Sequence, residues 1–170
     1  IPGLITPAAY ETLLLQVLLW INLPPVMAEP LNLVWWTLPV ELSFYLILPL
    51  IGLISRAVDW RAMLLAALLI TLSWRSWVFL SANAGNLMST LPVMDSLVGV
   101  FFTFMLGFSM NFISAKPSAR ARRVIFWSGV ISLLALMQWQ LTLDEVYWTG
   151  HWILVVWPPT VALSIALSVY

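Results

Sequence analysis

The chain lacks cysteine altogether and contains a single histidine among its 170 residues. No disulfide, thiolate metal site or cysteine nucleophile is therefore possible, and one histidine cannot form a multi-histidine metal centre. Charged residues make up 8% of the chain, whereas soluble domains carry roughly a quarter. Seven basic and seven acidic residues balance to zero net charge, which argues against a nucleic-acid partner. Because hydrophobic residues supply 62% of the chain, we expect a polytopic membrane protein.

The apolar runs predict the spans. A membrane-spanning helix needs about 20 mostly apolar residues. We expect six helices, over residues 7–21, 36–54, 62–80, 95–114, 124–141 and from about 151 to 170. The sequence therefore predicts an all-α, polytopic transmembrane helix bundle in one domain over residues 1–170. Since it opens in a loop-like "IPGLITP" and stops inside an apolar run, we expect a membrane domain truncated at both ends.

Two basic segments orient these helices. Residues 116–123, "KPSARARR", follow the fourth expected helix, and Arg56 and Arg61 follow the second. The intervening segments, "SANAGNLMSTLPVMD" and "LTLDEVYWTGH", contain acidic residues and no lysine or arginine. The positive-inside rule places both basic segments on the cytoplasmic side. The start of the second helix then lies toward the extracytoplasmic side.

One carboxylate, Glu41, lies inside the apolar run "WWTLPVELSFYLILPL" of residues 35–50. At 100° per residue it shares a helix face with Thr37 and Tyr45, and Pro49 predicts a kink one turn further on. Two interpretations remain open from the residues alone. Glu41 is either an acid favoured by the dipole at a helix N-terminus or an intramembrane functional group.

The same run carries a resemblance to a known family. Residues 36–50, "WTLPVELSFYLILPL", resemble the signature W-S-L-x-V-E-x-x-F-Y-L-x-x-P-L of the acyltransferase 3 family of integral membrane acyltransferases. Thr37 takes the place of the serine. The chain departs from many members at Leu42 and Ser43, where they carry a second acid and a glutamine. The family's first helices, with an arginine and a histidine thought central to catalysis, are not among these residues.

The resemblance implies a function. Members move acyl groups, commonly acetyl from acyl-CoA, onto hydroxyls of cell-surface carbohydrates or lipid-linked sugars. It implies that this chain belongs to an O-acetyltransferase of the bacterial inner (plasma) membrane. The donor substrate would be acyl-CoA, the acceptor a glycan, and no cofactor or metal would be bound. Glu41 would be catalytic, and Trp36, Thr37, Tyr45 and Arg75 would bind substrate. The cofactor-binding residues stay unknown.

Other polar residues have simpler interpretations beside functional ones. Arg75 either snorkels to lipid headgroups or is a buried partner of Glu41 or of a substrate oxygen. Asp95 is expected to cap the fourth helix, and His151 is either an interfacial aromatic or part of an acceptor cleft. The basic segment 116–123 either fixes the topology and attracts anionic lipid or binds the phosphates of CoA.

A carrier remains the main alternative to the enzyme. "WPP" at residues 157–159 predicts a broken or kinked last helix, because neither proline can donate a backbone hydrogen bond. Broken helices and an intramembrane acid also occur in secondary transporters. A transporter or flippase fragment, or a membrane scaffold without catalysis, therefore stays open.

Overall fold

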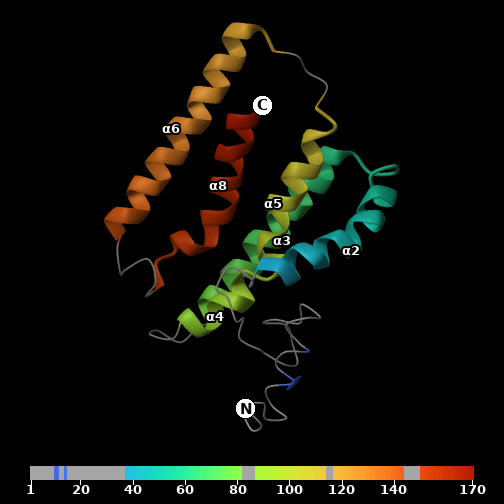
Figure 1. The fold of residues 1–170 in the computed structure, drawn as a ribbon, viewed down its shortest axis with the longest axis vertical. Coiled ribbons are helices and arrows are strands. Elements are labelled where there is room, and N and C mark those ends of the chain that lie inside the picture. The colour runs from blue at the N-terminus through green and yellow to red at the C-terminus, as the bar shows by residue number, and fades with distance from the viewer. Residues whose placement is uncertain (1–9, 12–13, 15–36, 82–86, 114–116, 144–149) are drawn as a thin grey trace, which may run out of the picture. The chain divides into compact units, whose positions relative to one another are not determined.

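The computed structural model describes residues 10–11, 14, 37–81, 87–113, 117–143 and 150–170 (Figure 1). Within these ranges the structure has six helices and no strand, so the predicted all-α fold is confirmed for the described residues. The chain divides into two compact units, residues 1–51 and 52–170. The expected helix over residues 7–21 lies largely outside the described residues. Within that range the structure describes Tyr10, Glu11 and Leu14, which are helical and exposed.

The first unit contains most of helix α2, Leu38–Ile54, whose last three residues pass the boundary of the unit. Pro39 occupies its first turn, where a missing N–H costs no helical hydrogen bond. The Ser43 hydroxyl donates to the Pro39 carbonyl oxygen at 2.6 Å. The helix continues through Pro49 to Ile54. The expected start at residue 36 is therefore close to the observed one.

The second unit contains α3 (Trp60–Ser81), α4 (Leu87–Met94), α5 (Leu97–Met110), α6 (Ala119–Leu143) and α8 (Ile153–Val169). Side-chain caps set two of the starts. The Asp59 carboxylate accepts from the Arg61 N–H at 3.0 Å, and the Ser118 hydroxyl accepts from the Ala121 N–H at 3.3 Å. Each cap satisfies an amide that has no partner within its own helix.

Two boundaries differ from the sequence prediction. The segment before Asp95, expected as a loop, contains the eight-residue helix α4, and α5 begins only at Leu97. Helix α6 begins at Ala119 rather than at residue 124, because the Ser118 cap and the alanines and arginines that follow favour a helix. Its first turns therefore include Arg120, Arg122 and Arg123.

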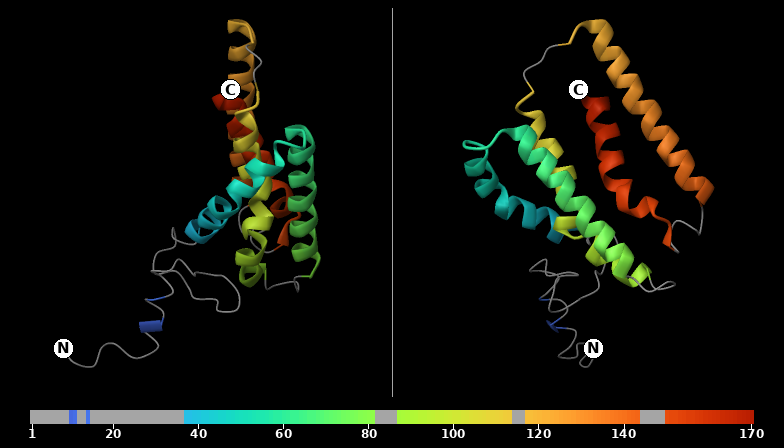
Figure 2. Two further views of the ribbon diagram at one scale, coloured as in Figure 1. Left: turned by 90° about the vertical axis from the view of Figure 1, so that its right-hand side faces the viewer. Right: turned by 180° about the vertical axis from the view of Figure 1, so that it is seen from behind.

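The helices of the second unit pack side by side. Helix α6 lies along α8, α8 also contacts α5 and α3, and α5 packs along α3 (Figures 1 and 2). One buried cluster joins α3, α4 and α8 through Val78, Met94, Ile153 and Leu154. A second joins α5 and α8 through Phe102, Leu106 and Ala162. The core thus follows the shared faces of α3, α5 and α8.

Helices α6 and α8 approach closely because small residues meet there. A Cβ added to Gly129 would lie 2.6 Å from the Ser164 carbonyl oxygen and from the Ser168 amide. The buried Ser164 hydroxyl donates to that of Ser132 at 3.0 Å across the two helices. Small residues and interhelical hydroxyl contacts of this kind are typical of helix packing in membranes.

Two of the described helices, α3 and α6, are long and apolar enough to cross a membrane. Their outward faces carry large apolar side chains: Leu65, Leu69, Ile70, Trp77 and Leu80 on α3, and Val124, Phe126, Trp127, Ile131, Leu134, Met137 and Leu141 on α6. Helices α2, α5 and α8 are also apolar but have 14 to 17 residues. By length and composition, the structure supports association with a membrane.

Candidate functional site

Glu41 lies in the first turn of α2 and is partly exposed. The position matches the interpretation in which the helix dipole favours an acid, since the free amides of the first turn are nearby. It also leaves the carboxylate accessible to a partner. The location alone therefore does not separate the dipole interpretation from the functional one.

The other residues of the signature segment, residues 36–50, differ in how exposed they are on α2. Thr37 immediately precedes the helix and is partly buried, whereas Tyr45 is 62% exposed. The adjacent Phe44 is buried, and its ring centroid lies 6.3 Å from that of Tyr45. Trp36 lies outside the described residues. The catalytic role of Glu41 and the substrate contacts of Thr37 and Tyr45 stay predictions.

Arg75, in the second half of α3, donates hydrogen bonds to several groups of the second unit. Only 2% of it is exposed. One terminal nitrogen lies 2.7 Å from the Asp95 carboxylate and 3.2 Å from the Met94 carbonyl oxygen, and the Nε–H donates to the Leu154 carbonyl oxygen at 2.9 Å. The snorkelling interpretation is therefore wrong, because the guanidinium points into the helix bundle rather than out of it.

Two of the carbonyls that Arg75 binds, those of Leu154 and Met94, are left free by breaks in the helices. Leu154 lies four residues before Pro158, which has no N–H to donate to it. Met94 ends α4, so its carbonyl is one of the last four that lack a helical donor. Buried carbonyls without partners are costly, and a guanidinium with five donors can satisfy several at once. The prolines and the α4–α5 break thus explain why an arginine belongs here.

Asp95 completes this site rather than capping a helix. It lies between α4 and α5, and Ser96 holds the N-cap position of α5 without a side-chain cap hydrogen bond. The Asp95 side chain is 26% exposed, and its carboxylate pairs with Arg75. The predicted capping role is therefore wrong. A carboxylate next to a buried arginine contributes more to stability as the arginine's charge partner than as a cap at a partly exposed helix end.

Gly99 allows the start of α5 to lie close against the end of α4. A Cβ at this position would lie 1.7 Å from the Met94 carbonyl oxygen and 3.2 Å from the Trp74 ring. The Gly99 carbonyl oxygen also lies 3.3 Å from the terminal nitrogen of Arg75. A side chain here would separate α4 from α5 and displace the carbonyl that Arg75 binds.

Thr71, one turn before Arg75, enters the hydrogen bonding of α5. Its buried hydroxyl donates to the Val98 carbonyl oxygen at 3.3 Å and accepts from the Phe102 N–H at 3.0 Å. These two groups are four residues apart, the pair that a regular α-helix joins directly. Thr71 and Arg75 together attach α3 to the first turns of α5.

His151 lies just before α8, among aromatic rings. Its Nδ1 accepts from the Ile153 N–H at 3.2 Å, and its ring centroid lies 5.5 Å from Trp152 and 6.5 Å from Trp139. This arrangement favours the interpretation of His151 as one of a cluster of aromatics at a helix end.

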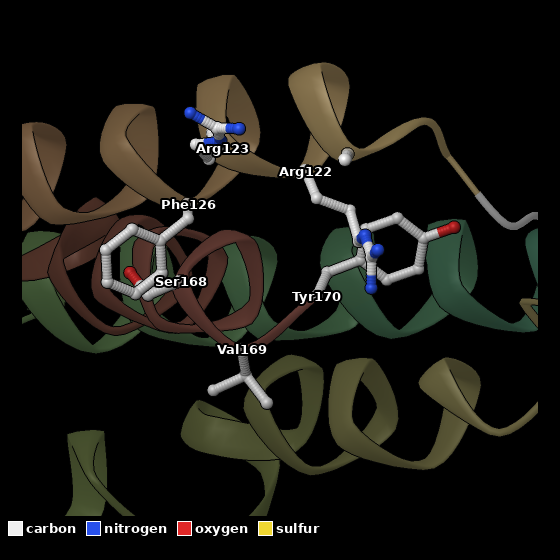
Figure 3. A pocket seen from close by; sticks show the side chains of 7 residues that line it. Arg122, Arg123, Phe126, Ser168, Val169 and Tyr170 are labelled. Atoms are coloured by element: carbon white, nitrogen blue, oxygen red, sulfur yellow. The ribbon is translucent and has the colours of Figure 1, made fainter.

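A pocket of about 420 Å³ lies between the start of α6 and the end of α8 (Figure 3). Its lining consists of Ala119, Arg122, Arg123, Phe126, Ser168, Val169 and Tyr170. The sequence pointed to the basic segment but not to the pocket, because the partner residues come from a helix some 45 positions later. Among the described residues no group of three or more metal-ligating side chains comes together.

The structure brings Arg75 and Asp95 together, whereas Glu41 and Arg75 belong to different units. Arg75 donates to protein acceptors on three sides, so its role as a substrate ligand stays a prediction without a free face to support it. Comparison of the chain with protein-family models, curated proteins and solved structures found no match.

Proposed function

We propose that the chain is part of an integral membrane acyltransferase that moves an acyl group, commonly acetyl, from acyl-CoA to a hydroxyl of a cell-surface carbohydrate or lipid-linked sugar. The observation that supports this proposal is the resemblance of residues 36–50 to the signature of the acyltransferase 3 family. The match includes Glu41 and the aromatic pair Phe44 and Tyr45 at their expected spacing.

The apolar helices support the membrane part of the proposal. Helices α3 and α6 have the length and composition of spans, and large apolar side chains cover their outward faces. Such faces are stable against lipid and unfavourable against water. Helices α2, α5 and α8 are shorter than a full span. In this proposal the bilayer is locally thinned around them, as it is around short apolar helices. In this proposal the helices form one polytopic bundle of the bacterial inner membrane.

Glu41 supplies one of two chemical roles. Acyl transfer to a sugar needs a base to accept the hydroxyl proton and donors to stabilise the tetrahedral oxyanion. A carboxylate in the first turn of α2 can orient a histidine and stabilise its positive charge, or accept a hydrogen bond from a sugar hydroxyl. In the family, that histidine belongs to helices outside residues 1–170.

The carrier alternative rests on the broken helices. In transporters, free carbonyls at such breaks bind the coupling ion. Here the Leu154 and Met94 carbonyls already accept from Arg75, which is itself a cation. A positive side chain at this place disfavours a second cation, and the broken helices therefore give the carrier little support.

The test is acyl-CoA consumption by the full-length protein with candidate glycans, for wild type, Glu41→Gln and Glu11→Gln. The Glu41→Gln change keeps size and removes charge, so we expect turnover to fall by on the order of 10², about 2.7 kcal/mol. Glu11, an exposed acid outside the signature, is the matched control and should leave turnover unchanged. An acid that merely favours the helix dipole contributes only about 0.3 to 1 kcal/mol of stability. Wild-type turnover in a folded Glu41→Gln protein would contradict the catalytic role.

A further inference from the structure

The pocket between α6 and α8 combines two guanidinium groups with an apolar side. Arg122 and Arg123 come from the first two turns of α6, and Val169 and Tyr170 from the end of α8. Figure 3 shows Arg122 extending from α6 toward Tyr170, while the Arg123 guanidinium stays beside α6. Phe126 and Ser168 close the other end of the pocket.

Among the described residues, the ion pair between side chains is Arg75–Asp95, which does not involve the arginines of this pocket. Arg122 and Arg123 are exposed. They also lie at a helix N-terminus, where the dipole adds to their positive potential and disfavours cations. An anion that binds there would be stabilised by both the helix dipole and the two guanidinium groups.

The surroundings indicate what kind of anion fits. The forked guanidinium matches phosphate oxygens, and that of Arg122 extends from α6 toward Tyr170 in the pocket (Figure 3). Phe126 and Val169 are 42% and 74% exposed. The outward face of α6 continues from them with Trp127 and Ile131, both exposed and apolar. A phospholipid would fit both the arginines and the apolar face of α6. Its phosphate would contact the arginines, and its acyl chains would contact the apolar face.

We propose that this pocket binds the phosphate of an anionic phospholipid, with Arg122 as the principal ligand and Arg123 as the second. Basic pockets between helices at the cytoplasmic side of membrane proteins bind anionic headgroups. The positive-inside rule assigns the start of α6 to that side. The inference rests on the membrane placement in the proposed function and is independent of acyl transfer.

The experiment measures lipid binding by the full-length protein in a neutral detergent. Native mass spectrometry compares phosphatidylglycerol with phosphatidylcholine of the same acyl chains, for wild type, Arg122→Gln, Arg123→Gln and the control Arg120→Gln. Arg120 is exposed in the same turn of α6 but does not line the pocket. An arginine near an anionic headgroup contributes about 1 kcal/mol, which is about fivefold in binding.

We expect wild type to prefer phosphatidylglycerol, Arg122→Gln to weaken that binding by about fivefold or more, and Arg120→Gln to change it by less than about twofold. Equal binding of the two lipids by wild type would overturn the proposal without reference to any variant. Equal losses in Arg120→Gln and Arg122→Gln would also overturn it, since a diffuse basic surface would then suffice. Displacement of the lipid by excess coenzyme A would assign the pocket to a nucleotide phosphate instead. None of these results depends on whether the protein consumes acyl-CoA.

Discussion

Replacing Arg75 with methionine should be among the most destabilising single changes in the second unit. The substitution keeps an unbranched side chain of similar reach but removes every donor. The Leu154 and Met94 residues whose carbonyls it binds are 2% and 0% exposed, so water cannot replace the guanidinium there. Two buried carbonyls without donors cost about 1–3 kcal/mol each. Removing one partner of a buried ion pair costs about 3–5 kcal/mol. We expect Arg75→Met to lower the free energy of unfolding by an amount in that range.

The assay is equilibrium unfolding of the purified protein in detergent, followed by circular dichroism. Arg56→Met serves as the control, because Arg56 is exposed in the turn before α3. Its replacement should change the free energy of unfolding by no more than about 0.5 kcal/mol. If Arg75→Met unfolds with the free energy of wild type, the carbonyls do not depend on the guanidinium and the explanation of the buried arginine fails.

A second substitution tests the cause. Pro158→Ala restores an N–H that can donate to the Leu154 carbonyl oxygen, the same acceptor that Arg75 uses. In the Arg75→Met background it should recover part of the lost stability, about 1 kcal/mol for one hydrogen bond. In the wild-type background the acceptor is already taken, so the gain should be smaller. Equal effects in both backgrounds would show that the proline and the arginine are independent.

Two further predictions concern the glycines and the topology. Gly99→Ala should destabilise by about 1–3 kcal/mol, because its Cβ would overlap the Met94 carbonyl oxygen, whereas Gly107→Ala, with nothing within 4 Å, should gain up to about 1 kcal/mol. The same unfolding assay measures both, and equal effects would contradict the close approach at Gly99. Cysteines placed at Ser118 and Thr142, at opposite ends of α6, should differ in intact cells: an impermeant thiol reagent should label Thr142→Cys and not Ser118→Cys. Labelling of Ser118→Cys alone would reverse the orientation.

The bounds of a helix could be predicted from the sequence where a run of apolar residues alone determines them. The run over residues 62–80 predicts α3 within two residues of its observed bounds, Trp60–Ser81. The start of α6 was missed because the basic residues before residue 124 suggest a loop, while the Ser118 cap extends the helix through them. Helix α4 was missed for a similar reason, since Pro92 and the polar residues before it suggest a loop.

The partners of Arg75 could not be predicted, although part of the signal was present. Asp95 and Leu154 lie 20 and 79 residues away, and only the packing of the helices brings them to α3. The sequence does indicate which carbonyl lacks a donor, because Pro158 frees Leu154 four residues before it. Combining that carbonyl with the arginine inside the apolar run of residues 62–80 would have suggested the contact. For Glu41, neither the sequence nor its first-turn position decides between the dipole and catalysis.

The contacts of Arg75 also set an order in which the chain can mature. During synthesis the ribosome delivers α3 first, then Asp95 after 20 further residues, and the Leu154 carbonyl only after 79. Until α8 emerges, the Nε–H has no acceptor of its own and the arginine relies on the α4–α5 break alone. A chain that stops before Leu154 therefore keeps an incompletely paired charge in an apolar helix, which is the kind of defect that quality-control proteases and chaperones encounter in unfinished proteins. Helix α8 is in this sense the element that completes the pairing of the arginine in α3.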